Sequence, residues 1–263
     1  MRKRLIPCIF LKNGLIIRSE DYKTHQLIGN ALEEVARYND WAVDEIMYID
    51  ISTEEKYDLR RDDLKVKDDF KTKYDLVREV SKVCFVPLGF GGGIRTIDDI
   101  KNILKNGADK VILNTILFLD DNFVTQAAEI FGNQALVACV DYRDDGYVYH
   151  SHGKINSQIK VLDWCKHLEA KRIGEIVLNN IDRDGKANGY DTKTIKEVVE
   201  HTNVPIVALA GAGDNFDFVE CFEEANPSAV AAGNIFHFKE HSYYHGKQAL
   251  LNANVDIRKE WGN

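Results

Sequence analysis

The chain has 263 residues, with 34 lysines and arginines against 42 aspartates and glutamates, and its net charge is −8 at neutral pH. This acidic balance, with no concentrated basic tract, argues against broad binding to nucleic acid or to an anionic membrane surface. An apolar fraction of 44% and a charged fraction of 29% exclude a disordered or fibrous chain. The longest apolar runs, such as 204–212, are far shorter than the roughly 18 residues that cross a bilayer.

The cysteines and the first residues indicate a cellular setting. Five cysteines, at positions 8, 84, 139, 165 and 221, form no C-x-x-C pair, so they fit neither a disulfide framework nor a zinc site. The basic start is followed by an apolar run that Lys12 ends, and no small-residue cleavage site follows. We therefore expect a first strand instead of a signal peptide, and a protein of the reducing cytoplasm.

Short β-rich apolar runs alternate with stretches of helical periodicity along the whole chain. The predicted strands are 5–11, 45–51, 86–89, 110–113, 135–140, 175–179, 205–208 and 229–232. The predicted helices are 28–39, 75–82, 97–106, 122–131, 160–170, 191–202, 215–224 and 242–251. Eight strand-then-helix units predict a single-domain (β/α)8 TIM barrel over residues 1–263. Because periodicity does not show closure, a doubly wound open sheet is the alternative.

The two halves of the sequence repeat each other. Gly91-Gly92-Gly93 recurs 120 residues later as Gly211-Ala212-Gly213, and Asn114 recurs as Asn234 at the same offset. The segment 7–10 is echoed by 138–141, and 49–51 by 181–183. Several echoes in one order predict a barrel made of two duplicated half-barrels.

Glycine runs at predicted strand ends indicate phosphate binding. Without a Cβ, backbone N–H groups can approach an anion closely, and the following helix N-terminus adds partial positive charge. A single such run is more often only a tight turn, but here two symmetric copies each precede a polar residue one strand later. The sequence predicts two opposite phosphate sites and a ligand with two separated phosphates. Their residues are Gly92, Gly93, Asn114 and Thr115 on one side, and Gly211, Gly233 and Asn234 on the other.

Several segments together resemble one family. These are RLIPC at 4–8, GGGIR at 91–95, GADKV at 107–111, DRDG at 182–185, GYD at 189–191 and IFH at 235–237. They are similar to the cyclase subunit of imidazole glycerol phosphate synthase, over nearly the whole chain. The resemblance implies a two-half barrel that docks a glutaminase subunit below, receives ammonia through the barrel, and closes an imidazole ring above, as a lyase without metal or redox cofactor. It also implies that Asp184 and Gly185 bind phosphate.

The resemblance fails at one catalytic position. The family uses two aspartates as general acid and base at the ends of the first and fifth strands; the second is present as Asp141, but the first is replaced by Phe10. Two facing carboxylates can hold different pKa values and divide acid and base roles, whereas a phenylalanine cannot move a proton. The flanking departures are Arg18, Asn179, Leu209 and Ala210. A long charged loop, 54–73, is either a solvated insertion or a substrate cover.

The opposite end of the predicted barrel keeps the family pattern. The positions of the ammonia gate are Arg4, Glu45, Lys110 and Glu175, and Asp109 matches a glutaminase-contacting position. Buried charges need partners, so a purely structural salt-bridge layer is the alternative to a gate.

Two functions remain open, and the loss of the first-strand aspartate favours the first. In it, the chain is a cyclase paralogue that takes ammonia from a glutaminase to turn an acetamido group of a surface-polysaccharide sugar into an acetamidino group, with a third enzyme that activates the sugar. In the second, it is the histidine-pathway cyclase, acting on a phosphorylated small molecule, with Asp50 or Asp182 replacing the lost acid. A catalytically silent ammonia conduit is a third possibility. His150 and His152 fit a polar hairpin better than a metal pair, because no third ligand is evident.

Overall fold

The computed structural model describes residues 2–20, 22–53, 56–57, 71–238 and 241–259. Eight parallel strands pair around a closed barrel, in which β12 pairs with β1 and β7 with β10. These strands are β1 (Arg4–Lys12), β4 (Ile46–Asp50), β5 (Leu88–Gly91), β6 (Lys110–Leu113), β7 (Leu136–Tyr142), β10 (Glu175–Asn180), β11 (Ile206–Leu209) and β12 (Ala229–Ala232). The predicted TIM barrel is confirmed, and the open sheet is excluded.

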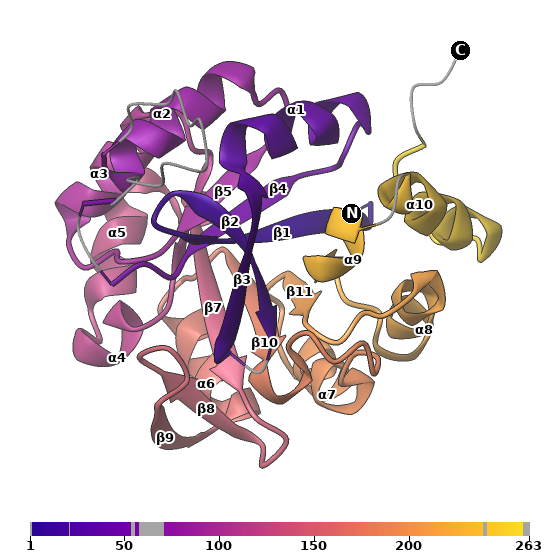
Figure 1. The fold of residues 1–263 in the computed structure, drawn as a ribbon. Coiled ribbons are helices and arrows are strands. Elements are labelled where there is room, and N and C mark those ends of the chain that lie inside the picture. Colours follow the sequence, from indigo (N-terminus) through magenta and orange to yellow (C-terminus); the bar gives the residue numbers. More distant parts are fainter. Residues whose placement is uncertain (1, 21, 54–55, 58–70, 239–240, 260–263) are drawn as a thin grey trace.

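Helices surround the barrel and cover the outer faces of its strands (Figure 1). They are α1 (Ala31–Asp40), α2 (Lys73–Val83), α3 (Ile97–Lys105), α5 (Phe123–Phe131), α6 (Val161–Ala170), α7 (Thr192–His201), α8 (Asn215–Ala225) and α10 (Ser242–Asn252). Capping boxes begin α2, α3 and α8, where a Thr or Asp side chain and an Asp three residues later satisfy each other's backbone N–H groups. Among the described residues, no helix is both long and apolar enough to span a bilayer.

A hairpin follows each of the first and fifth barrel strands, and only the second of them was predicted from the sequence. They consist of β2 (Leu15–Glu20) with β3 (Thr24–Asn30), and of β8 (Tyr147–His150) with β9 (Ile155–Lys160). The expected helix at 28–39 was wrong at its start, because residues 28–30 belong to β3 and Asn30 caps α1 by accepting from Leu32 N. Short helices α4 (Ile116–Leu119) and α9 (Asn234–Phe238) follow β6 and β12, and the 3₁₀ turns are η1 (Asn133–Ala135) and η2 (Ile181–Arg183). The two hairpins and the two short helices sit at equivalent places in both halves, after the first and fifth and after the fourth and eighth barrel strands, which extends the duplication; the two 3₁₀ turns do not.

The polar hairpin expected around His150 and His152 is present, since β8 ends at His150 and the turn to β9 follows. The described residues contain no cluster of three or more potential metal ligands. Most of the charged loop expected at 54–73, namely residues 54–55 and 58–70, lies outside the described part of the chain.

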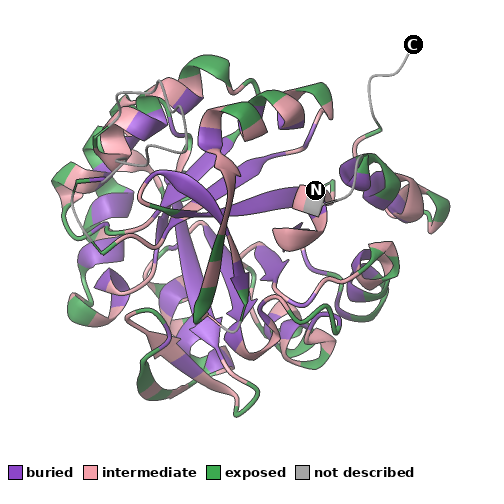
Figure 2. Ribbon diagram, viewed as in Figure 1, coloured by how far each residue is buried: buried purple, intermediate pink, exposed green. Residues whose placement is uncertain are grey.

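Two apolar layers hold the fold together, and the buried strands run through the centre of the molecule (Figure 2). The larger cluster lies between barrel and helices, and a smaller one fills the barrel interior. Because successive side chains of a strand point to opposite faces, every second residue of each strand faces the interior. On β1 the inward residues are Ile6, Cys8 and Phe10, and Arg4 follows the same alternation.

Candidate active site and the opposite end of the barrel

Four charged side chains meet at the end of the barrel where the strands begin. The Arg4 guanidinium donates to both Glu45 and Glu175. Lys110 Nζ lies 2.8 Å from Glu45 Oε1 and 2.9 Å from Glu175 Oε2. Each residue therefore touches both neighbours of opposite charge, and the four predicted gate residues form a closed ring.

The ring keeps its charges because its members compensate one another. Burial acts to raise the pKa of Glu175, but Arg4 and Lys110 outweigh it, and the net pKa is lowered. Burial acts to lower the pKa of Arg4, but Glu175 and Glu45 outweigh it, and the net pKa is raised. Removing one member would leave an unpaired buried charge, which is costly.

Asp141 lies at the other end of the barrel interior, on β7, and is 4% exposed. Its Oδ1 accepts hydrogen bonds from Asn179 Nδ2 at 2.7 Å and from the Tyr22 hydroxyl at 3.2 Å, and its Oδ2 accepts from Asn114 Nδ2 at 3.1 Å. Burial raises the pKa of Asp141 to about 6, although all these bonds favour the charged form. A carboxyl that titrates near neutral pH is suited to both accept and release a proton.

The first predicted phosphate site lies beside Asp141, at the ends of β5 and β6. At Gly92, with φ of +115°, a Cβ would lie 2.1 Å from the Asp50 carbonyl oxygen, so the close approach of these two chains requires glycine. Asn114 donates to Asp141, and the Thr115 hydroxyl accepts from Ser151 N at 3.3 Å. Asn114 is thus tied to the Asp141 carboxyl and Thr115 to the β8–β9 turn, while the glycine loop packs against the end of β4.

A lysine that was not predicted reaches this first site. Lys73 opens α2, and its Nζ donates to the Gly93 carbonyl at 2.7 Å. Gly93 adopts φ of +58°, and a Cβ there would lie 3.3 Å from the same ammonium group. The sequence analysis included Lys73 only as the last residue of the charged loop 54–73, and nothing there indicated this contact, because Lys73 and Gly93 belong to different βα units.

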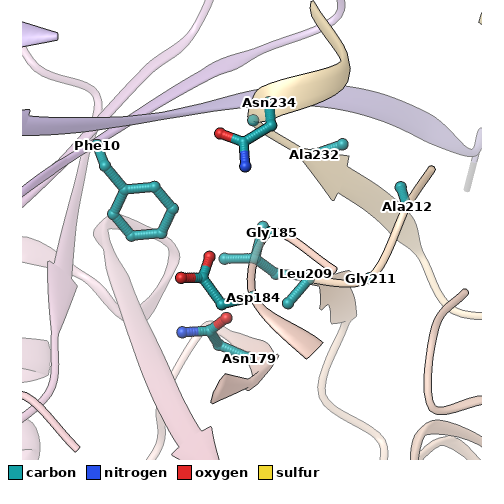
Figure 3. A pocket seen from close by; sticks show the side chains of 11 residues that line it. Phe10, Asn179, Asp184, Gly185, Leu209, Gly211, Ala212, Ala232 and Asn234 are labelled. Carbon is teal, nitrogen blue, oxygen red and sulfur yellow. The ribbon is translucent and has the colours of Figure 1, made fainter. Parts of the chain in front are cut away.

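The second predicted phosphate site borders a cavity at the ends of β10, β11 and β12 (Figure 3). Its lining includes Asp184, Gly185, Gly211, Gly233 and Asn234, so the structure brings the five predicted residues together. The other residues that line this cavity are Phe10, Asn179, Leu209, Ala210, Ala212 and Ala232.

Ala210 departs from ideal backbone geometry at this second site. Its φ is +78°, a left-handed conformation in which a Cβ is strained. Gly211 follows with φ of +103°, and there a Cβ would lie 2.1 Å from the Gly189 carbonyl oxygen. The loop therefore keeps its turn despite the alanine.

The end of the β2–β3 hairpin is docked onto the second site. The Ser19 hydroxyl donates to Asp184 Oδ2 at 2.6 Å, and the backbone N–H of Tyr22 donates to the same oxygen at 3.0 Å. Asn234 Nδ2 donates to the Ser19 carbonyl at 3.0 Å. Two predicted phosphate residues, Asp184 and Asn234, thus hold the hairpin in this structure.

Phe10 lies near the end of β1, where the resemblance led us to expect a catalytic aspartate. Its side chain faces the barrel interior, is 7% exposed, and meets the Tyr22 ring edge-on with a centroid distance of 6.3 Å. Tyr22 was not predicted as a site residue, since nothing in a short hairpin sequence shows that its turn folds back over the barrel.

The two acids considered as replacements are engaged elsewhere. Ile49 faces the barrel interior, so its neighbour Asp50 points outward. On the outer side, the hydroxyls of Tyr57 and Ser52 each donate a hydrogen bond to Asp50 at 2.5 Å. Asp182 is paired with Arg143. Neither takes the inward position of the missing carboxyl.

Asp109 has a role within the fold that the sequence did not indicate. Its carboxylate accepts a hydrogen bond from the Leu88 backbone N–H at 2.8 Å, and its own N–H donates to the Leu88 carbonyl at 2.8 Å. The resemblance implied only a glutaminase contact for Asp109, whereas in the structure Asp109 also fixes the start of β5.

The fold and these two barrel ends define a TIM barrel of duplicated halves, with a ring of four charged side chains at one end and a buried carboxyl between two glycine-lined loops at the other. The model of the histidine biosynthesis protein family matches residues 4–242. A putative imidazole glycerol phosphate synthase subunit hisF2 of Vibrio vulnificus is 36% identical, over 98% of this chain and 92% of its own. The HisF subunits of Hydrogenobaculum sp. and Natranaerobius thermophilus are 34% and 32% identical, each over 98% of this chain and 99% of their own. The chain therefore belongs to the HisF family of histidine biosynthesis proteins.

Proposed function

We propose that the chain is the cyclase subunit of an imidazole glycerol phosphate synthase and that Asp141 is its acid–base group. The observation that carries the proposal is the position of Asp141: it is buried at the strand ends, between two glycine-lined sites, with a pKa of about 6. The relatives favour this function over the polysaccharide paralogue that the sequence alone favoured.

The arrangement fits a substrate with a phosphate at each end. Gly92, Gly93, Asn114 and Thr115 form one cradle, and Lys73 adds a positive charge beside it. Across the barrel, the backbone around Gly211 and Gly233 forms the other. A ligand held at both ends would cross the barrel mouth above Asp141, and fixing its reacting atoms there removes much of the entropic barrier of ring closure.

Ammonia would enter through the ring of Arg4, Glu45, Lys110 and Glu175 at the opposite end. The interior between this ring and Asp141 is lined by apolar side chains such as Cys8, Met47 and Val177. Neutral ammonia crosses an apolar passage more easily than ammonium does, because the ion would lose its hydration. We infer that a glutaminase subunit delivers it at this face.

The cyclase proposal is tested with the purified chain, ammonium chloride and the bisphosphate ribonucleotide substrate of the cyclase. We expect formation of imidazole glycerol phosphate, and a loss of at least about 100-fold in Asp141→Asn, since one acid–base group contributes about 10²–10⁴-fold. Asp145→Asn, an exposed neighbour, is the control and should retain the rate. No product from the wild-type protein would refute the proposal.

The docking of a glutaminase is tested through Phe85, whose side chain is 83% exposed and which precedes β5 at the ring end of the barrel. Phe85→Ser should weaken a pull-down of the glutaminase subunit of an imidazole glycerol phosphate synthase. The matched control is Phe216→Ser, because Phe216 is 78% exposed but lies on the first turn of α8, at the opposite end. Equal retention by both variants would place the partner elsewhere.

One observation favours a second function, the amidination of a sugar. Phe10 and Leu209 line the barrel mouth beside the second cradle with apolar side chains. A reaction that uses two facing carboxylates would need a second acid where Phe10 lies. This candidate predicts that the wild-type protein binds its glutaminase and yet yields no imidazole product. In that case, adding the glutaminase, glutamine and the sugar-activating enzyme would replace the carbonyl oxygen of an acetamido sugar by an imino nitrogen, with release of that oxygen on the activating group or as water. A small decrease in the mass of the sugar together with a gain of one positive charge would establish this second function.

A further inference from the structure

The position opposite Asp141 contains an unexpected proton-bearing group. The first strand has Phe10 where the family has an aspartate, and Asp50 and Asp182 are held by other partners. The group that does reach Asp141 is the hydroxyl of Tyr22, which comes from the end of the β2–β3 hairpin and lies 3.2 Å from Asp141 Oδ1. The Phe10 ring packs against the edge of the Tyr22 ring.

The hydrogen bonds around this hydroxyl fix its direction. Asn179 Nδ2 donates to the Tyr22 oxygen at 2.7 Å and to Asp141 Oδ1 at 2.7 Å, which uses both hydrogens of the amide nitrogen. The Tyr22 oxygen therefore already accepts one bond, and its own hydrogen points to Asp141. Each of the three side chains of Tyr22, Asn179 and Asp141 is therefore hydrogen-bonded to the other two, and Asp141 Oδ1 accepts from both of its partners.

The backbone of Tyr22 holds the ring in this place. Its φ of 56° is in the left-handed region, and its N–H is fixed by Asp184 Oδ2 at 3.0 Å. The Ser19 hydroxyl binds the same oxygen at 2.6 Å. Asp184 thus positions the hairpin end, and with it the hydroxyl that faces Asp141.

The groups that face this hydroxyl favour its protonated form. Burial and then the charges of Asp141, Cys139 and Asp184 raise the pKa of Tyr22 well above its usual value. The phenol therefore keeps its proton over the whole range in which Asp141 titrates, and it acts as a fixed donor.

We propose that Tyr22 is a positioning residue for the cyclase reaction: its hydroxyl compensates for the missing first-strand carboxyl by donating a hydrogen bond to Asp141 and stabilising the ionised form that accepts a proton. The role of Tyr22 in the reaction rests on the proposed cyclase function. The contact between the two side chains can be tested without turnover.

The first experiment follows the titration of Asp141 by carbon-13 NMR of aspartate-labelled protein, with the resonance assigned through Asp141→Asn. In Tyr22→Phe, which keeps the ring and loses the hydroxyl, we expect the Asp141 midpoint to rise by about one pH unit, because a hydrogen bond to a charged group is lost. The matched control is Tyr57→Phe, which removes the equivalent phenol from Asp50 and should leave the Asp141 midpoint unchanged.

The sign of the change separates this role from simple packing. If Tyr22→Phe merely released the hairpin, water would reach Asp141 and its midpoint would fall toward the ordinary value of 3.8. A fall, or no change, overturns the inference.

The second experiment measures cyclase rates against pH. If ionised Asp141 is required, a rise of one pH unit in its midpoint lowers the Tyr22→Phe rate about fivefold at pH 6 and hardly at pH 8. A uniform loss at both pH values would overturn the inference. Absence of turnover in the wild type would instead refute the proposed function and leave the NMR result to decide on Tyr22.

Discussion

Replacing Asp141 by asparagine should stabilise the protein at high pH while removing its proposed chemistry. Asp141 is 4% exposed, and burial raises its pKa from an ordinary 3.8 to about 6. Above both values, this difference corresponds to about 3 kcal/mol of lost unfolding free energy, because each pKa unit is about 1.4 kcal/mol. Asparagine has no charge to bury and so avoids this cost.

The size of the gain depends on the hydrogen bonds that the amide cannot make. One oxygen of Asp141 accepts from Asn179 and Tyr22, and asparagine retains an oxygen for them. The other accepts from Asn114 Nδ2 at 3.1 Å, and an amide nitrogen there faces another donor. Losing that bond costs about 1 kcal/mol, so we expect a net gain of about 2 kcal/mol at pH 8.

The sign of the pH dependence follows from proton linkage. Between about pH 4 and pH 6 the unfolded chain releases the Asp141 proton while the folded chain retains it, so wild-type stability falls as the pH rises through this range. Near the lower end of this range, at pH 4.5, the folded chain holds Asp141 protonated and most of the cost of burying its charge is absent, so the advantage of the variant should nearly disappear.

Equilibrium unfolding in urea, followed by tryptophan fluorescence, measures the difference in unfolding free energy between Asp141→Asn and the wild type at pH 8 and at pH 4.5. Asp163→Asn, at an exposed site on α6, serves as the control and should show no comparable pH dependence. A less stable Asp141→Asn protein at pH 8, or an equal gain at both pH values, would refute the reasoning. Stability gained at a site of lost chemistry is a common trade-off.

Other substitutions address the remaining contacts. Asp109→Lys should lower the unfolding free energy by about 1–3 kcal/mol, because the Leu88 N–H loses its acceptor, whereas Asp109→Asn should not; equal melting temperatures would contradict this. Ala210→Gly should raise the unfolding free energy by about 1 kcal/mol by relieving φ of +78°, and a loss in urea unfolding would contradict it. Lys73→Met should weaken binding of inorganic phosphate severalfold by calorimetry, and an unchanged Kd would show that the ammonium beside Gly93 takes no part.

The sequence by itself determined the barrel and much of its order. The spacing of apolar runs placed all eight barrel strands to within a few residues, because buried parallel strands and amphipathic helices leave separate periodicities. The repeated glycine runs and the echo of 7–10 in 138–141 indicated two halves. The alternation of side chains along each strand then put Arg4 at one end of the interior and Phe10 at the other.

Only the tertiary structure decided how distant side chains meet. The hairpin of β2 and β3 has the local pattern of any polar hairpin, and its docking depends on Asp184, more than 160 residues away along the chain. The contact of Tyr22 with Asp141, the reach of Lys73 to Gly93, and the second role of Asp109 have the same origin. Each joins one βα unit to another, and since a hydrogen bond across such a distance leaves no periodic signal, it exists only once the barrel has closed.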